Sequence, residues 1–297
     1  MLFGNFAESK RTEVDGPDGT TEWLVELPDA PPQAMRKLFE IMHCRFVPFE
    51  QGKIRILYDL ITMADCYDSV EILRPLSHVW VDGLRRLNVR ELSATTLLAH
   101  AWVYYSLGQR ADYEQTGTVL VLDSVPADFT KTAHLTALPP MLLDNVRALR
   151  LQLLGKLLEP LYNATTVLLE GNASPLGICV WKGTRYSSDN SIEQEKVDCE
   201  QRLLGLLVRE LHRLRLWPRP DVADVDVAPR VLYNAMRRLA QPRKHMASDN
   251  HRNCVLELEP GNLANTGDDH NGLKGLEAFR YIASAKEVEF MARFTKK

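Results

Sequence analysis

The strongest constraint on the fold of this chain is the helical spacing of apolar residues in its second half. Leucines and other apolar residues recur at intervals of three or four in two long stretches, from Met141 to about Leu158 and from Ser191 to Leu216. This spacing places apolar side chains along one stripe of a helix, and such a stripe has to be buried against another element. The first helix is predicted to end before Pro160 and the second at Trp217-Pro218.

Weaker patterns predict the remaining elements. A strand is expected at Glu22–Leu27, where a short apolar run follows a turn-rich segment. Helices are expected from the spacing of apolar residues over 35–42, 54–64, 70–80, 89–107, 229–239 and 273–285. The segment 109–140 and a loop at about 243–272 are expected to be irregular. The fold class predicted is mainly α, with an α+β unit over residues 1–85 and a helical region over 86–297.

Composition supports an ordinary globular chain of 297 residues. Hydrophobic residues make up 45% and charged residues 25%, with 36 basic and 39 acidic side chains and a net charge of −3. This balance gives no general electrostatic attraction to nucleic acid or to an anionic membrane. No run approaches the roughly 20 apolar residues of a membrane helix, and the N-terminus lacks the features of a signal peptide. The five cysteines are odd in number and widely spaced, which favours a reducing compartment, cytoplasmic or nuclear.

A search for catalytic motifs finds none. The chain has no G-x-S-x-G elbow, phosphate-binding loop, G-x-G-x-x-G segment or H-E-x-x-H pair. Function has to be argued from a site, and none of these sites is present in the sequence. We therefore expect a non-catalytic protein with no organic cofactor.

The cysteines and histidines allow one metal hypothesis. His251 and Cys254 form an H-x-x-C pair, whose short spacing lets two side chains from one turn reach the same ion. A tetrahedral zinc site needs four ligands, and the other candidates are Cys179 and Cys199. Their distance along the chain favours the simpler interpretation that all four are ordinary buried or loop residues. A structural zinc site that fastens a loop to a helix is the alternative.

The first 85 residues resemble a known family. The segments Phe3-Gly4-Asn5-Phe6-Ala7-Glu8-Ser9, Trp23 to Asp29, Met35 to His43 and Leu57 to Asp68 are similar, in this order, to the second half of a BTB/POZ domain. The likeness is greatest to BTB proteins of filamentous fungi, which carry a helical C-terminal region. In those proteins an H-x-x-C pair is followed by a Gly-Leu segment, as His251 to Cys254 and Gly275-Leu276 are here.

The resemblance implies a partial BTB/POZ fold. A complete domain of this family would have strands and a helix ahead of Met1, including the segment that usually forms a homodimer. The apolar start of the chain, Met1-Leu2-Phe3, leads us to expect a truncated sequence, a short form or a fragment completed by a partner.

The resemblance also implies a role in protein–protein interaction. Some members of the family bind a cullin scaffold through a hydrophobic-x-glutamate motif, and Phe6-Ala7-Glu8 has this form. The expectation is a substrate adaptor for a cullin-based ubiquitin ligase. Two alternatives stay open: a BTB protein that only forms homo-oligomers as a scaffold or in transcription, and a chain in which Phe6 packs in the domain while Glu8 is solvated. For Phe6 and Glu8 themselves, packing of Phe6 in the domain with a solvated Glu8 is the favoured interpretation.

Overall fold

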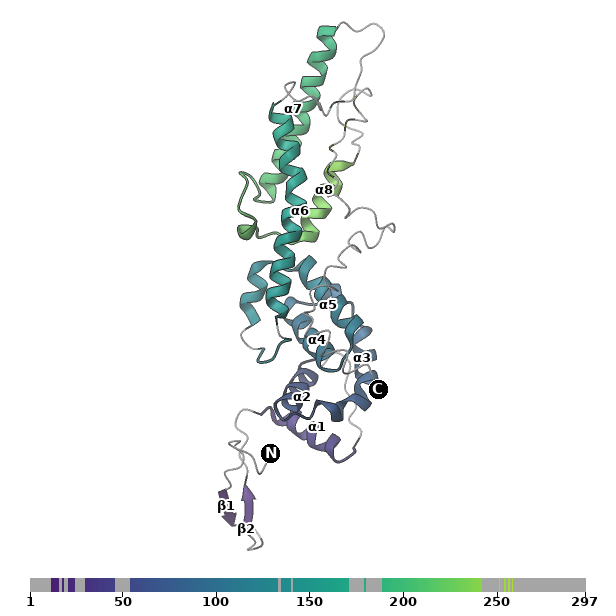
Figure 1. Cartoon of the computed structure of the whole chain (residues 1–297), viewed down its shortest axis with the longest axis vertical. Coiled ribbons are helices and arrows are strands. Elements are labelled where there is room, and N and C mark those ends of the chain that lie inside the picture. Colours follow the sequence, from purple (N-terminus) through teal and green to yellow (C-terminus); the bar gives the residue numbers. More distant parts are fainter. Residues whose placement is uncertain are drawn as a thin grey trace. The chain divides into compact units, whose positions relative to one another are not determined.

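The computed structural model describes residues 12–15, 18, 21–24, 30–45, 54–132, 135–139, 141–170, 179, 189–241, 251, 254, 256 and 258. Within them the chain is mainly helical, which confirms the prediction from the spacing of apolar residues (Figure 1). The chain divides into two compact units, one of residues 1–116, 133–139 and 291–297 and the other of residues 117–132 and 140–290. The expected boundary after residue 85 falls inside the first unit. No helix among the described residues is long and apolar enough to cross a membrane.

The first unit contains a short hairpin and a set of helices. Strand β1 (Thr12–Asp15) pairs antiparallel with β2 (Thr21–Leu24), with Thr12 opposite Leu24. The predicted strand coincides with β2 in its described part, whereas β1 has a single apolar residue and no detectable alternation. The elements that follow are α1 (Pro32–Met42), α2 (Ile54–Cys66), a 3-10 turn (Val70–Leu73), α3 (Arg74–Arg85), a second 3-10 turn (Val89–Glu91) and α4 (Ala94–Ser106).

Helix α4 lies at the centre of the core of the first unit. Every residue from Leu97 to Ser106 is buried, so this helix has no solvent-facing side over that span. The indole N–H of Trp102 donates a hydrogen bond to Thr62 Oγ1 of α2 at 3.1 Å. The hydroxyl of Tyr58, also on α2, donates to the carbonyl of Ala137 at 2.8 Å and accepts its N–H at 2.7 Å. These bonds join α2 to α4 and to residues 135–139.

The start of α4 differs from the prediction. The spacing predicts one helix from Val89 to Leu107 that opens at Asn88, but Asn88 caps only the 3-10 turn, by accepting the N–H of Arg90. The hydroxyl of Ser93 then accepts the N–H of Thr96 and starts a new helix. Two competing caps within a few residues therefore divide the predicted helix. Its end is as predicted, at Gly108, whose φ of 71° suits a residue without Cβ.

The segment 109–140 is more ordered than expected. It contains helix α5 (Arg110–Asp123) and a 3-10 turn (Pro126–Thr132). Helix α5 carries the boundary between the units, with Thr116 in the first and Gly117 in the second. Its glycine, threonines and valines have low helix propensity, so the local sequence does not favour a helix here. Burial of Tyr113 and of the apolar residues 119–122 outweighs that propensity.

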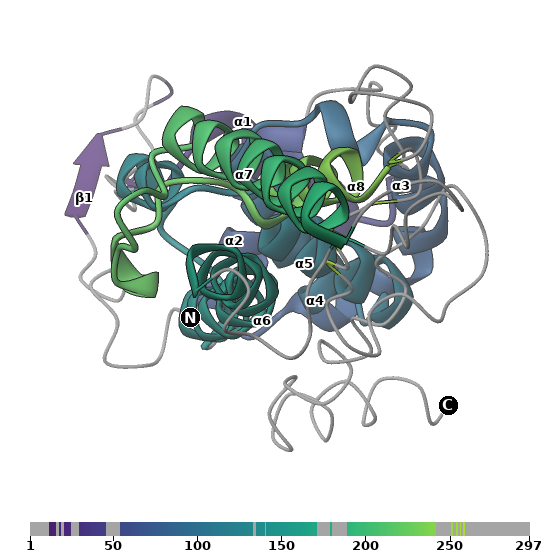
Figure 2. The same cartoon turned by 90° about the horizontal axis from the view of Figure 1, so that it is seen from above.

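The second unit is built around two long helices. Helix α6 (Leu142–Glu170) packs against α7 (Asp189–Arg213) and α8 (Pro229–Ala240), with a 3-10 turn (Val222–Asp224) before α8 (Figures 1 and 2). The prediction that the first long helix stops before Pro160 was wrong, since α6 continues through it. Proline inside a helix costs about 3 kcal/mol. Burial of Leu157, Leu158 and Leu161 on both sides of the proline offsets this cost.

A buried arginine connects three parts of the second unit. Arg150 of α6 is only 3% exposed. Its guanidinium donates to the carbonyls of Ser124 at 3.2 Å, Val225 at 2.7 Å and Val227 at 3.1 Å. Burial lowers the pKa of Arg150, while the nearby Asp226 raises it. Buried backbone carbonyls need a hydrogen-bond donor. This one side chain provides it for a carbonyl that precedes α6 and for two carbonyls that follow α7.

Acidification is expected to destabilise the first unit through His100. This side chain is fully buried in α4, and within the described part of the chain neither of its ring nitrogens has a hydrogen-bond partner. Burial lowers its pKa from 6.5 to about 4. The unfolded chain therefore binds more protons between these pH values, so stability present above pH 6.5 is lost as the pH falls toward 4. The loss amounts to about 3 kcal/mol.

Urea denaturation at several pH values measures this effect. His100→Leu is expected to remove the additional loss of stability below pH 6.5, because leucine has nothing to protonate. The control is His78→Leu, since His78 is exposed on α3 and should leave the pH dependence unchanged. Equal pH dependence in wild type and His100→Leu would contradict the prediction.

Candidate metal centre

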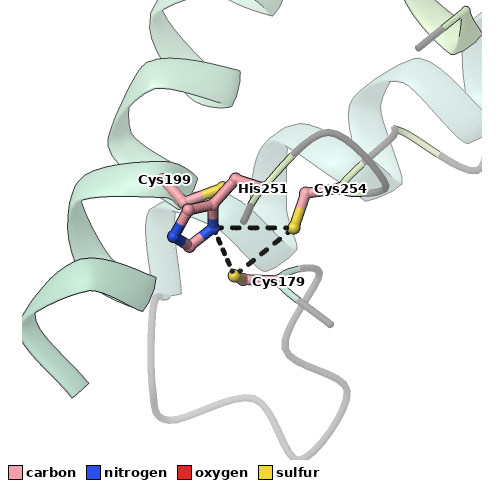
Figure 3. A group of neighbouring side chains, drawn as sticks. All are labelled: Cys179, Cys199, His251 and Cys254. Atoms are coloured by element: carbon pink, nitrogen blue, oxygen red, sulfur yellow. Dashed lines mark hydrogen bonds between the residues drawn. The ribbon is translucent and has the colours of Figure 1, made fainter. Parts of the chain in front are cut away.

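Four buried side chains from three separate segments of the second unit meet at one point. Cys199 comes from α7, Cys179 from the segment between α6 and α7, and His251 and Cys254 from the segment after α8 (Figure 3). Their ligand atoms all lie within 4.8 Å of one another. These are the four residues of the zinc hypothesis. The structure therefore brings the whole set together, against the simpler interpretation that they are unrelated.

The distances between the atoms match a tetrahedral site. Cys179 Sγ lies 3.5 Å from Cys254 Sγ and 3.4 Å from His251 Nδ1, and Cys254 Sγ lies 3.7 Å from the same nitrogen. With Zn–S bonds of about 2.3 Å and Zn–N bonds of about 2.0 Å, tetrahedral angles place two sulfurs about 3.8 Å apart and a sulfur and a nitrogen about 3.5 Å apart. Three of the four ligand atoms therefore already have the separations that a zinc ion requires, and Cys199 Sγ lies within 4.8 Å of each of them.

The histidine presents a defined nitrogen to the sulfurs. Nδ1 of His251 faces Cys179 and Cys254, as Figure 3 shows. The other nitrogen, Nε2, lies 3.6 Å from Oε2 of Glu195, on α7. A histidine that binds metal through one nitrogen commonly presents the other to a carboxylate or a carbonyl. The orientation of the ring is therefore compatible with metal binding through Nδ1.

Local backbone geometry explains how each loop ligand is held. The N–H of Cys254 donates to the carbonyl of His251 at 2.9 Å, which closes the H-x-x-C turn and brings both side chains to one side. The N–H of Cys179 donates to Oε1 of Glu200 at 3.2 Å. Glu200 is the residue after Cys199, and its side chain is buried. Helix α7 thus provides one sulfur directly and anchors a second through its neighbour.

The electrostatics of the cluster favour a cation. Burial raises the pKa of the Cys199 thiol well above its ordinary value, and the nearby Cys179 and Cys254 raise it further. The Cys199 thiol is therefore neutral without a metal, and a bound cation would be needed to stabilise it as the thiolate that ligates zinc. With three sulfurs and one imidazole, all four tetrahedral positions come from the protein. Soft sulfur donors together with one histidine are typical of structural zinc.

Sequence reasoning missed the two glutamates of this site. Glu195 precedes Cys199 by four residues, a spacing that puts both on the same side of a helix and that was a usable signal. Glu200 follows Cys199 directly, and this spacing gives no such signal. The two predicted partner-binding residues, Phe6 and Glu8, lie outside the described residues.

The first unit has a separate polar pocket of about 380 Å³. Arg85 and Asp112 in its wall form a bidentate ion pair at 2.9 and 2.6 Å, and this pairing raises the pKa of Arg85. Burial raises the pKa of Tyr104, also in the wall, to about 12. Asn88 and Thr116 are engaged with backbone groups of their own segments. The polar groups of this pocket are thus largely used for internal structure.

The described part of the chain therefore offers one cluster with the chemistry of a metal centre. In comparisons with protein-family models, with curated proteins and with solved structures, nothing matches the chain.

Proposed function

We propose that this is a non-catalytic protein-interaction protein whose second unit is fastened by a structural zinc ion. The observation that carries the proposal is the buried group of Cys179, Cys199, His251 and Cys254, whose ligand atoms lie within 4.8 Å of one another and in which Cys179, His251 and Cys254 have the separations of a tetrahedral zinc site. Catalytic zinc sites keep one position open for water or substrate, whereas four protein ligands close the coordination sphere. A zinc ion here would hold two loop segments on α7 and would not activate a substrate.

Elemental analysis of the purified full-length protein tests this proposal. We expect about one zinc ion per chain, and its loss in Cys179→Ser and Cys254→Ser. Cys44 and Cys66 are exposed and lie in the first unit, so Cys44→Ser and Cys66→Ser are matched controls that should keep the metal. Wild-type protein that is free of metal after purification without chelators, and that does not take up added zinc, would refute the proposal.

The kind of interaction is a second proposal, which rests on the BTB/POZ resemblance of residues 1–85. A substrate adaptor for a cullin-based ubiquitin ligase is the function that Phe6-x-Glu8 supports. An oligomerising scaffold or transcription-associated BTB protein is the alternative. All five cysteines are free of disulfides, which supports a reducing compartment such as the cytoplasm or nucleus.

A pull-down with the N-terminal region of a cullin distinguishes these two functions. The comparison is wild-type chain against the double variant Phe6→Ala/Glu8→Ala. Binding that is lost in the variant supports the adaptor. Equal binding by both, or binding by neither, would exclude that role for the motif, and a stable homo-oligomer in light scattering would then favour the scaffold.

A further inference from the structure

We propose that Glu195 and Glu200 are positioning residues for the metal centre, each holding one loop-borne ligand against α7. This inference rests on the zinc site proposed above and adds two residues to it. Glu195 precedes Cys199 by four residues, so both side chains lie on one side of the helix, and Glu200 follows Cys199 directly, on the adjacent side that contacts Cys179. Helix α7 would then supply the ligand Cys199 itself, and its two glutamates would hold the ligands Cys179 and His251.

Glu200 is the stronger of the two supports. Its side chain is 7% exposed, and its Oε1 accepts the backbone N–H of Cys179 at 3.2 Å. Among the described residues its partner is the backbone of Cys179, and no lysine or arginine forms an ion pair with it. Burying a carboxylate without a cation is unfavourable unless it is well hydrogen-bonded. The hydrogen bond from Cys179 partly compensates the buried carboxylate, and it fixes the backbone that carries a metal ligand.

Glu195 acts on the orientation of His251. Its Oε2 lies 3.6 Å from Nε2 of the ring, on the side opposite the sulfurs. A carboxylate at this place favours the tautomer with the proton on Nε2, which leaves the lone pair of Nδ1 for the metal. Glu195 is 46% exposed, so its effect is screened by solvent and should be smaller than that of Glu200.

The two contacts have a common physical consequence. Cys179 and His251 are 72 residues apart in sequence, and both belong to segments that have to be brought to α7. A ligand that is already held in place loses less conformational freedom when it binds the metal. Removing outer supports of this kind typically weakens metal binding by about 10- to 100-fold. We expect a loss in this range for Glu200→Ala and a loss near its lower end for Glu195→Ala.

Zinc affinity of the full-length chain, measured by competition with a chelator of known affinity, tests the inference. Glu200→Gln keeps an oxygen that can accept the N–H of Cys179, so it is expected to restore most of the affinity that Glu200→Ala loses. Glu195→Gln should restore that of Glu195→Ala in the same way. Glu193→Ala, an exposed glutamate on the same helix, is the matched control and should bind zinc like wild type.

Cobalt substitution adds a readout that a general loss of stability would not change. In the alanine variants, Co²⁺ bound at saturation should give weaker or shifted visible absorption, because the ligands are less well placed, while the glutamine variants should resemble wild type.

If wild type binds zinc and all glutamate variants bind it equally, the inference fails and the zinc site stands. If the glutamine variants lose as much as the alanine variants, positioning through these contacts is likewise refuted. Absence of zinc binding by wild type would instead refute the site itself. Should Glu200→Ala fail to fold, the zinc affinity of Glu200→Gln and the comparison of Glu195→Ala with Glu195→Gln still test the inference.

Discussion

Removal of zinc from the wild-type protein is expected to lower its melting temperature by about 10 °C or more. Structural zinc in small peptides contributes roughly 10–16 kcal/mol to folding, and in a larger chain with its own core we expect several kcal/mol. The reason is that the ion joins Cys179 and the turn of His251 and Cys254 to α7. Without it, three buried thiols and an imidazole remain with only weak mutual contacts.

The effect should be strongest in the segment after α8. Leu256 and Leu258, which follow the ligand Cys254, are buried, so their packing depends on the turn that the metal holds. Hydrogen exchange of peptides that contain these residues should accelerate after chelation, and much more than exchange in α4 of the first unit. Re-addition of zinc should restore the wild type but not Cys199→Ser. Cys66→Ser should behave like wild type throughout, and an unchanged melting temperature after complete zinc removal would contradict the prediction.

Replacing Arg150 by methionine is expected to destabilise the second unit by about 3 kcal/mol. Methionine fills similar volume but donates no hydrogen bonds, so the carbonyls of Ser124, Val225 and Val227 lose their partner. Leaving a buried polar group unsatisfied costs about 1–3 kcal/mol, and some of these carbonyls can regain water as the segment relaxes. Arg150→Lys should restore only part of the loss, because an ammonium group cannot reproduce the planar geometry of the guanidinium.

Chemical denaturation of the zinc-loaded protein measures this effect. Lys156→Met is the matched control, since Lys156 is an exposed cation on the same helix and its replacement should change stability by less than about 0.5 kcal/mol. A similar small change for Arg150→Met would mean that its three hydrogen bonds contribute little to the stability of the unit.

The helices were predictable where the apolar spacing is regular. The second long stripe, Ser191 to Leu216, corresponds to α7, and the helix predicted over 229–239 corresponds to α8. In α1 the spacing of Met35, Leu38, Phe39 and Met42 predicts one buried stripe, and half of it is buried. Met35 and Leu38 are buried, but Phe39 and Met42 are 42% and 49% exposed, because the buried face turns toward Ala34 and Ile41. Side-chain spacing gave the helix, while the packing of α1 against α2 decided which face is buried.

The candidate site was predictable in chemistry but not in assembly. The H-x-x-C spacing of His251 and Cys254 indicated a turn with two ligands, and the structure closes that turn with a backbone hydrogen bond. Nothing local to Cys179 or Cys199 distinguished them from ordinary buried cysteines. Glu200 was missed because a glutamate in an amphipathic helix is normally an exposed residue.

The sequence by itself determined that this chain is mainly helical, and it supplied the donor types of a zinc site. Helical periodicity depends on neighbours three and four residues away, so that information is contained in each segment. Only the tertiary structure decided that α6 continues through Pro160, that Arg150 is buried, and that Cys179 meets Cys254 across 75 residues of chain. Each of these depends on burial against distant segments, whose favourable free energy exceeds the local preference and is set only when the helices pack.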